Sequence, residues 1–139
     1  MLRTMIARAG TTALVASLLV MISPGQSDAG RSFKPYGSIS SKNFVLKRGC
    51  HTYFYRYEIT PPTEEWDAEV FIVSPDGTGL ASDVIFSAVD KKRGRNSYEV
   101  CRPSTTYGKH KLKMKVTFNR GREVFDGFVK PSSFRFKRR

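Results

Sequence analysis

The chain has 139 residues, a formal net charge of +12, and only two cysteines and two histidines. Its length fits one globular domain with one core and excludes a second domain. No residues after Gly30 form an apolar run long enough to span a bilayer, which excludes an integral membrane protein beyond that point.

Residues 1–29 are predicted to form a cleavable secretory signal peptide, because they contain the parts that export machinery recognises. Arg3 and Arg8 form a basic beginning, and residues 13–22 are apolar apart from Ser17. The alternative is an uncleaved membrane anchor. A helix over residues 13–22 rises only about 15 Å, however, whereas roughly 30 Å of hydrocarbon must be crossed.

Cleavage is predicted between Ala29 and Gly30, since Ser27 and Ala29 are the small residues that such a site requires. No cysteine for a lipid anchor lies nearby, and the two early arginines do not form a twin-arginine pair. We therefore expect general secretion of a single mature domain, residues 30–139, to a place outside the cytoplasm.

Cys50 and Cys101 are the only pair available for a disulfide. An oxidising compartment would let them join, and two buried free thiols are the alternative. For a loop of this length the chain-entropy account predicts a stabilisation of roughly 4 kcal/mol, which strain and residual unfolded structure would reduce. Export favours the disulfide.

The clearest predicted strand covers residues 109–118, where apolar residues recur at every second position. Alternate residues from His110 to Phe118 share one face of this strand, and lysines occupy the other face. A slip of one residue would bury those lysines, so the register of the strand should be firmly set.

Two more long strands are predicted at residues 50–60 and 66–74, and the first of them places Tyr53, Tyr55 and Tyr57 on one face. Shorter strands are predicted at residues 39–46, 84–89, 97–101, 123–129 and 134–137. Outside the signal peptide no segment has helical periodicity. Seven or eight short strands indicate an all-β fold, a single antiparallel β-sandwich.

The spacing of Cys50, Trp66 and Cys101 resembles the immunoglobulin-like pattern. In that family a Trp on the third strand packs against a disulfide between the two sheets, which the resemblance implies here. The family's tyrosine corner would place Tyr two residues before the second cysteine, where this chain has Glu99. The stretches GCHTY at residues 49–53 and VSPDG at residues 73–77 are also similar to small secreted proteins of actinobacteria, which implies export and no particular activity.

No group of residues predicts catalysis or a cofactor. His51 follows a cysteine and His110 shares the core face of its strand, so both are interpreted as structural. Pairing of the two cysteines leaves no thiol nucleophile, and no Gly-x-Ser-x-Gly motif occurs. Residues 64–67 are the densest acidic point and offer oxygen ligands for Ca²⁺, but they lack EF-hand spacing. We expect neither enzymatic activity nor a metal or cofactor.

Charge is the remaining functional signal. Without the signal peptide, the chain has 22 basic and 11 acidic residues, a net charge of +11. The candidate anion-binding residues form a lysine stripe (Lys109, Lys111, Lys113, Lys115), a basic loop (Lys91, Lys92, Arg93, Arg95) and a C-terminal tail (Arg135, Lys137, Arg138, Arg139). Lysines about 7 Å apart lie within a Debye length of roughly 8 Å and can act as one patch. Alternating lysines are also typical of a solvated strand face, above all on edge strands.

Three functional hypotheses remain. The leading one is a secreted, non-enzymatic module that binds anionic polymers or the cell envelope through its basic surface. The first alternative is a secreted effector or inhibitor that presents a loop, such as residues 90–96 or 102–108, to a protein partner. A small extracellular hydrolase is the third.

Overall fold

The structure, a computed structural model, describes residues 32–139, so the predicted signal peptide and its cleavage site lie outside the described residues. The strands are β1 (Gly37–Ser40), β2 (Phe44–Val45), β3 (Cys50–Ile59), β4 (Glu65–Val73), β5 (Gly79–Phe86), β6 (Arg93–Cys101), β7 (Gly108–Arg120), β8 (Glu123–Phe128) and β9 (Ser132–Lys137). Two short 3₁₀ turns complete the described part, η1 (Lys34–Tyr36) and η2 (Arg102–Ser104). Within these residues no helix is long and apolar enough to cross a membrane.

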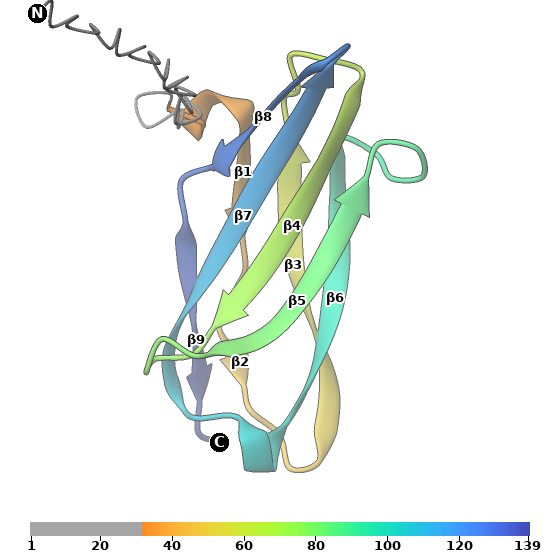
Figure 1. The fold of residues 1–139 in the computed structure, drawn as a ribbon. Coiled ribbons are helices and arrows are strands. Elements are labelled where there is room, and N and C mark those ends of the chain that lie inside the picture. Colours follow the sequence, from red (N-terminus) through yellow and green to blue (C-terminus); the bar gives the residue numbers. More distant parts are fainter. Residues whose placement is uncertain (1–31) are drawn as a thin grey trace, which may run out of the picture.

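The strands form two sheets that pack face to face, which confirms the predicted all-β sandwich (Figure 1). The small sheet has the order β1-β3-β6, and the large sheet has the order β2-β9-β7-β4-β5 with β8 also paired to β7. All pairings are antiparallel except that of β2 with β9, which is parallel. The described residues contain nine strands rather than seven or eight.

The extra strand arises because the strand predicted at residues 39–46 is divided between the sheets. β1 pairs with β3 in the small sheet, whereas β2 pairs with β9 in the large sheet. Ile39 and Leu46 are both buried, so the apolar pattern runs through the division without marking it. Periodicity reports which face of a strand is buried, and it carries no information about which strand lies alongside.

Strand β7 lies in the middle of the large sheet and forms its core. It pairs with β4 along one side and with β8 and β9 along the other. Leu112, Met114, Val116 and Phe118 have no exposed surface. The predicted register of this strand is therefore confirmed, and its lysines point to the outer face.

The aromatic face of β3 packs from the small sheet toward the same core. Tyr53, Tyr55 and Tyr57 share one face, as predicted, and all three are buried. The Tyr55 hydroxyl donates a hydrogen bond to the Asp83 carboxylate on β5. The Asn96 side chain on β6 donates to the same carboxylate oxygen at 3.1 Å. Because β5 and β6 belong to different sheets, this polar cluster joins the sheets along one side of the sandwich.

The predicted disulfide between Cys50 and Cys101 is confirmed, but its place differs from the immunoglobulin-like arrangement. The two residues lie directly opposite each other on β3 and β6, with their Cα atoms 3.9 Å apart. The bond therefore lies within the small sheet and does not connect the sheets. Trp66 is opposite Phe118 in the large sheet, near the end of the sandwich where β3 finishes, whereas the disulfide is where β3 begins.

Replacing Cys50 and Cys101 by alanine removes a cross-link over 51 positions. We expect the free energy of unfolding to fall by about 2–4 kcal/mol, because the reduced chain gains conformational freedom when it unfolds. Urea denaturation followed by circular dichroism measures this loss. Wild-type protein reduced with dithiothreitol should show the same loss, and a change below about 0.5 kcal/mol in both would contradict the prediction.

Tyr55→Phe removes the hydroxyl that links β3 to Asp83 while keeping the ring in the core. We expect a loss of about 1–2 kcal/mol, because the charged Asp83 carboxylate loses one of its two side-chain donors. Tyr36→Phe is the matched control, since its hydroxyl makes no hydrogen bond with any residue in the described range. Equal urea midpoints for the two variants would show that the cluster does not join the sheets.

Candidate anion-binding surfaces

The lysine stripe lies on the outer face of the large sheet, in the middle of the sheet and not on an edge strand. Its four members have different surroundings. Lys115 lies 3.3 Å from the Asp126 carboxylate and opposite Glu69 on β4. Lys113 lies 4.4 Å from the centre of the Phe128 ring. The charge of Lys115, at one end of the stripe, is therefore compensated by the Asp126 carboxylate.

The other end of the stripe continues onto β9. Lys109 and Lys111 are exposed, and Lys109 lies opposite Arg135 on that strand. Arg135 and Lys137 belong to β9 rather than to a tail, and their side chains are exposed. These four residues form a basic strip that no ion pair with a described carboxylate interrupts.

Strand β9 runs to the end of the sandwich where the chain's C-terminus lies (Figure 1). Arg138 and Arg139 follow β9 and line a groove there together with Arg102 of η2. The groove has a volume of about 1030 Å³. We call it the end groove, and its lining residues are Val45, Leu46, Lys47, Arg48, Arg102, Tyr107, Arg138 and Arg139. Five of these eight side chains are cationic and none is acidic.

Tyr107 organises two of the guanidinium groups in the end groove. The guanidinium carbon of Arg102 lies 4.2 Å from the centre of the Tyr107 ring, and that of Arg138 lies 5.0 Å from it. Arg102 also donates from Nε to the Tyr107 hydroxyl at 3.0 Å and from Nη1 to the Thr105 carbonyl at 3.1 Å. These two bonds fix the plane of the Arg102 guanidinium and leave its three other N–H donors for an anion.

The sequence contains a signal for the end groove in the basic residues that flank the two cysteines. Lys47 and Arg48 stand just before Cys50, and Arg102 directly follows Cys101. A disulfide between these cysteines must bring the two basic segments together. The structure shows this directly, because the Arg102 amide donates to the Gly49 carbonyl at 2.9 Å.

The predicted basic loop is only partly a loop. Lys91 and Lys92 lie in the connection before β6, but Arg93 and Arg95 lie on β6 itself and face outward. The expectation that residues 90–96 form one exposed loop was therefore wrong, because residues 93–96 pair with β3. Arg93 forms an ion pair with Glu58. The four basic residues of this region lie at or just before the start of β6, whereas the end groove lies beyond the end of that strand.

The two histidines occupy structural positions. His51 Nε2 lies 2.6 Å from the Arg48 carbonyl oxygen, in the turn that leads into β3. His110 is fully buried, and its ring stacks on Phe134 with centroids 5.5 Å apart. Burial lowers the pKa of His110, while a hydrogen bond to the Gly108 carbonyl and the charge of Asp76 act in the opposite direction.

The lowered pKa of His110 predicts a pH-dependent stability. Its contribution is complete above the ordinary value of about 6.5 and falls at lower pH, because the unfolded chain takes up a proton that the buried ring resists. The loss should approach 1.4 kcal/mol per pH unit at most, until the lowered folded-state pKa is reached. Urea denaturation between pH 7.5 and 5 measures this slope. His110→Phe should flatten it and His51→Gln should not; an unchanged slope in His110→Phe would contradict the assignment.

One group of three potential metal ligands occurs within residues 32–139, formed by Cys50, Glu99 and Cys101. The two sulfur atoms are joined in the disulfide, so they are not thiolate ligands. The acidic residues 64–67 do not gather with other ligands into such a group within the same range. The chain matches no known protein-family model and no curated protein, so function has to be inferred from the geometry of these surfaces.

Proposed function

We propose that the domain is a secreted, non-enzymatic module that binds anionic polymers of the cell envelope or its surroundings. The end groove is the observation that carries this proposal. It gathers five cationic side chains, two of them stacked on Tyr107, with no acidic side chain in its lining. Such a surface attracts polyanions because neutralising their charges releases condensed counterions.

The basic strip of Lys109, Lys111, Arg135 and Lys137 extends this surface along the outer face of the large sheet. Lys137 directly precedes Arg138, so the strip and the end groove meet at the end of β9. A polymer can therefore contact cations over more than one site. Export, which the disulfide supports, places envelope glycans and phosphate polymers among the first polyanions available.

The composition of the end groove also supports a binding function over hydrolysis. Its lining contains no histidine, cysteine or carboxylate side chain, the groups that most often act as general acids, bases or nucleophiles. Arginine and lysine side chains at this density serve attraction and positioning of anions.

A second candidate function is supported by the connection between β5 and β6. Val89 is 81% exposed there, and Phe86 at the end of β5 is 52% exposed. Exposed apolar side chains beside Lys91 and Lys92 suit contact with a protein. An effector or inhibitor that presents this loop to a partner is therefore the alternative.

Heparin chromatography across a salt gradient tests the polymer proposal. The variant K47Q/R48Q/R138Q removes three charges from the end groove and should elute at clearly lower salt, with a shallower dependence of retention on salt. The control K91Q/K92Q/R122Q removes three charges at the opposite end of the sandwich and should elute close to wild type. Equal losses in both variants would show that only net charge matters, and wild-type retention that does not weaken with salt would refute the proposal.

A further inference from the structure

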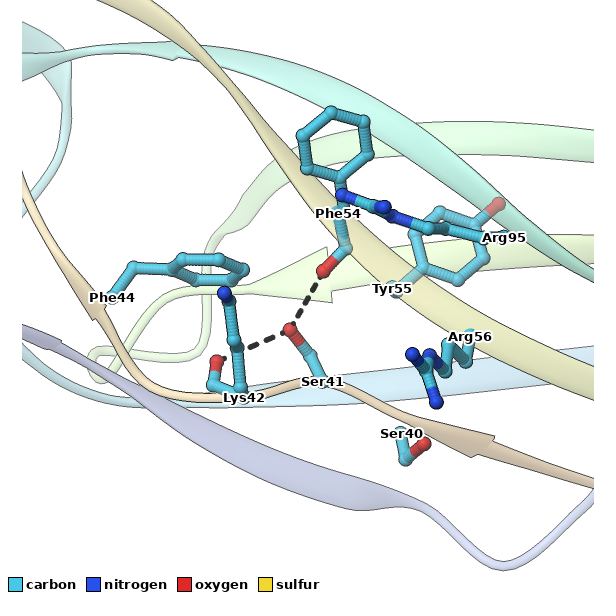
Figure 2. A pocket seen from close by; sticks show the side chains of 8 residues that line it. All are labelled: Ser40, Ser41, Lys42, Phe44, Phe54, Tyr55, Arg56 and Arg95. Atoms are coloured by element: carbon cyan, nitrogen blue, oxygen red, sulfur yellow. Dashed lines mark hydrogen bonds between the residues drawn. The ribbon is translucent and has the colours of Figure 1, made fainter.

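A second hollow lies where the chain crosses from the small sheet to the large sheet. β1 pairs with the edge of β3 as far as Ser40, which is opposite Arg56. The chain then leaves that edge, and the Ser41 hydroxyl donates to the Phe54 carbonyl at 2.9 Å (Figure 2). Departure of residues 41–43 opens a pocket of about 440 Å³ beside β3.

The pocket contains three cationic side chains, from Lys42, Arg56 and Arg95, and no acidic side chain lines it. Arg56 and Arg95 lie directly opposite each other on β3 and β6. Like charges at directly opposed positions of a sheet are destabilising. Neither arginine forms an ion pair with a carboxylate in residues 32–139, although the neighbouring pair Glu58 and Arg93 does.

Aromatic rings position two of these cations. The Arg95 guanidinium stacks on Phe54 at 3.8 Å from the ring centre, and the Lys42 ammonium lies 5.6 Å from the centre of the Phe44 ring. Figure 2 shows the two rings bordering the pocket, with Ser41 between the rings and Arg56, and with Ser40 below Arg56. The stacked guanidinium keeps its donors in plane for a bidentate contact with an oxyanion.

We propose that this pocket, defined by Lys42, Arg56 and Arg95, binds a single tetrahedral oxyanion, a phosphoryl or sulfate group carried on a flat apolar body. Ser41 donates its only O–H to the Phe54 carbonyl, so the donors left for a ligand are the three cations and the Ser40 hydroxyl. These donors exceed what the two oxygens of one carboxylate use, and they match the three free oxygens of a monoester. The exposed edge of Phe54 and the ring of Phe44 provide contact area for the attached body.

The volume of the pocket fits one such group. Ligand pockets commonly measure about 300–1,000 Å³, and this pocket lies toward the lower end of that range. It lies beside the small sheet, and its lining shares no residue with that of the end groove. The inference therefore does not rest on the polymer-binding proposal.

Calorimetric titration at low salt with phenyl phosphate tests the pocket. Wild-type protein should bind phenyl phosphate several-fold more tightly than inorganic phosphate, because the rings contact only the former. R56Q/R95Q should bind at least 10-fold more weakly, since two charged hydrogen-bond donors are lost. Phenyl sulfate in place of phenyl phosphate determines which of the two oxyanions the site prefers.

The charge-matched control is R122Q/K130Q, which removes two exposed cations that line neither the pocket nor the polymer-binding surface. It should bind phenyl phosphate within about twofold of wild type. Equal weakening in both double variants would overturn the proposal in favour of a general charge effect. Absence of wild-type binding, or equal binding of phenol, would also overturn it.

Thermal unfolding shows whether each variant is folded and gives a second readout. Wild-type Tm should rise by roughly 5 °C at a phenyl phosphate concentration ten times the wild-type Kd, and R56Q/R95Q should rise by less than about 2 °C at the same concentration. If R56Q/R95Q does not fold, Lys42→Gln in the crossing segment should reduce the rise on its own, and an undiminished rise would count against the site. Heparin retention of R56Q/R95Q should stay close to wild type, so the two proposals fail independently.

Discussion

The burial of one face of β7 is the constraint on which the arrangement of charge depends. Its inner side chains from Leu112 to Phe118 have no exposed surface, and three other strands pair with it. Burying each large apolar side chain contributes about 1.5–3 kcal/mol, so a shift by one residue would forfeit most of that energy and bury lysines. The lysines are thereby fixed on the outer face. The other lysine and arginine side chains of the described residues are likewise confined to the outer faces of the sheets and to the ends of the sandwich.

The disulfide brings the largest group of cationic side chains together, in the end groove. By joining the start of β3 to the end of β6, it holds the turn with Lys47 and Arg48 against the turn that begins with Arg102. Strand β9 ends beside them, and the residues that follow it add Arg138 and Arg139. Three segments distant in sequence thus contribute cations to one groove. Without the covalent bond, mutual repulsion would favour their separation.

Side-chain direction was predictable from the sequence, whereas pairing partners were not. The inward faces of β3 and β7 and the bond between Cys50 and Cys101 follow from period and composition, and the structure confirms them. The division of the lysine stripe depends on the ion pair between Lys115 and Asp126 of the neighbouring strand β8, and periodicity does not determine that β8 pairs with β7. The anion pocket likewise depends on which strand lies beside β3. Arg56 could not be identified as a binding residue from the sequence, because a single arginine on the outward face of a strand is common and does not reveal the arginine opposite it.

The compensated and uncompensated cations differ in a way that bears on function. Lys115 faces Asp126, and Arg93 faces Glu58, so in these places the sheet faces pair opposite charges as stability requires. Arg56 and Arg95 break that rule at adjacent positions of the same sheet, and they do so inside a hollow with aromatic sides. Departures from local consistency in natural proteins concentrate at functional sites, where a ligand supplies what the chain lacks. An oxyanion between the two guanidinium groups would turn their repulsion into attraction, and therefore the same pair that costs stability in the free protein would strengthen binding.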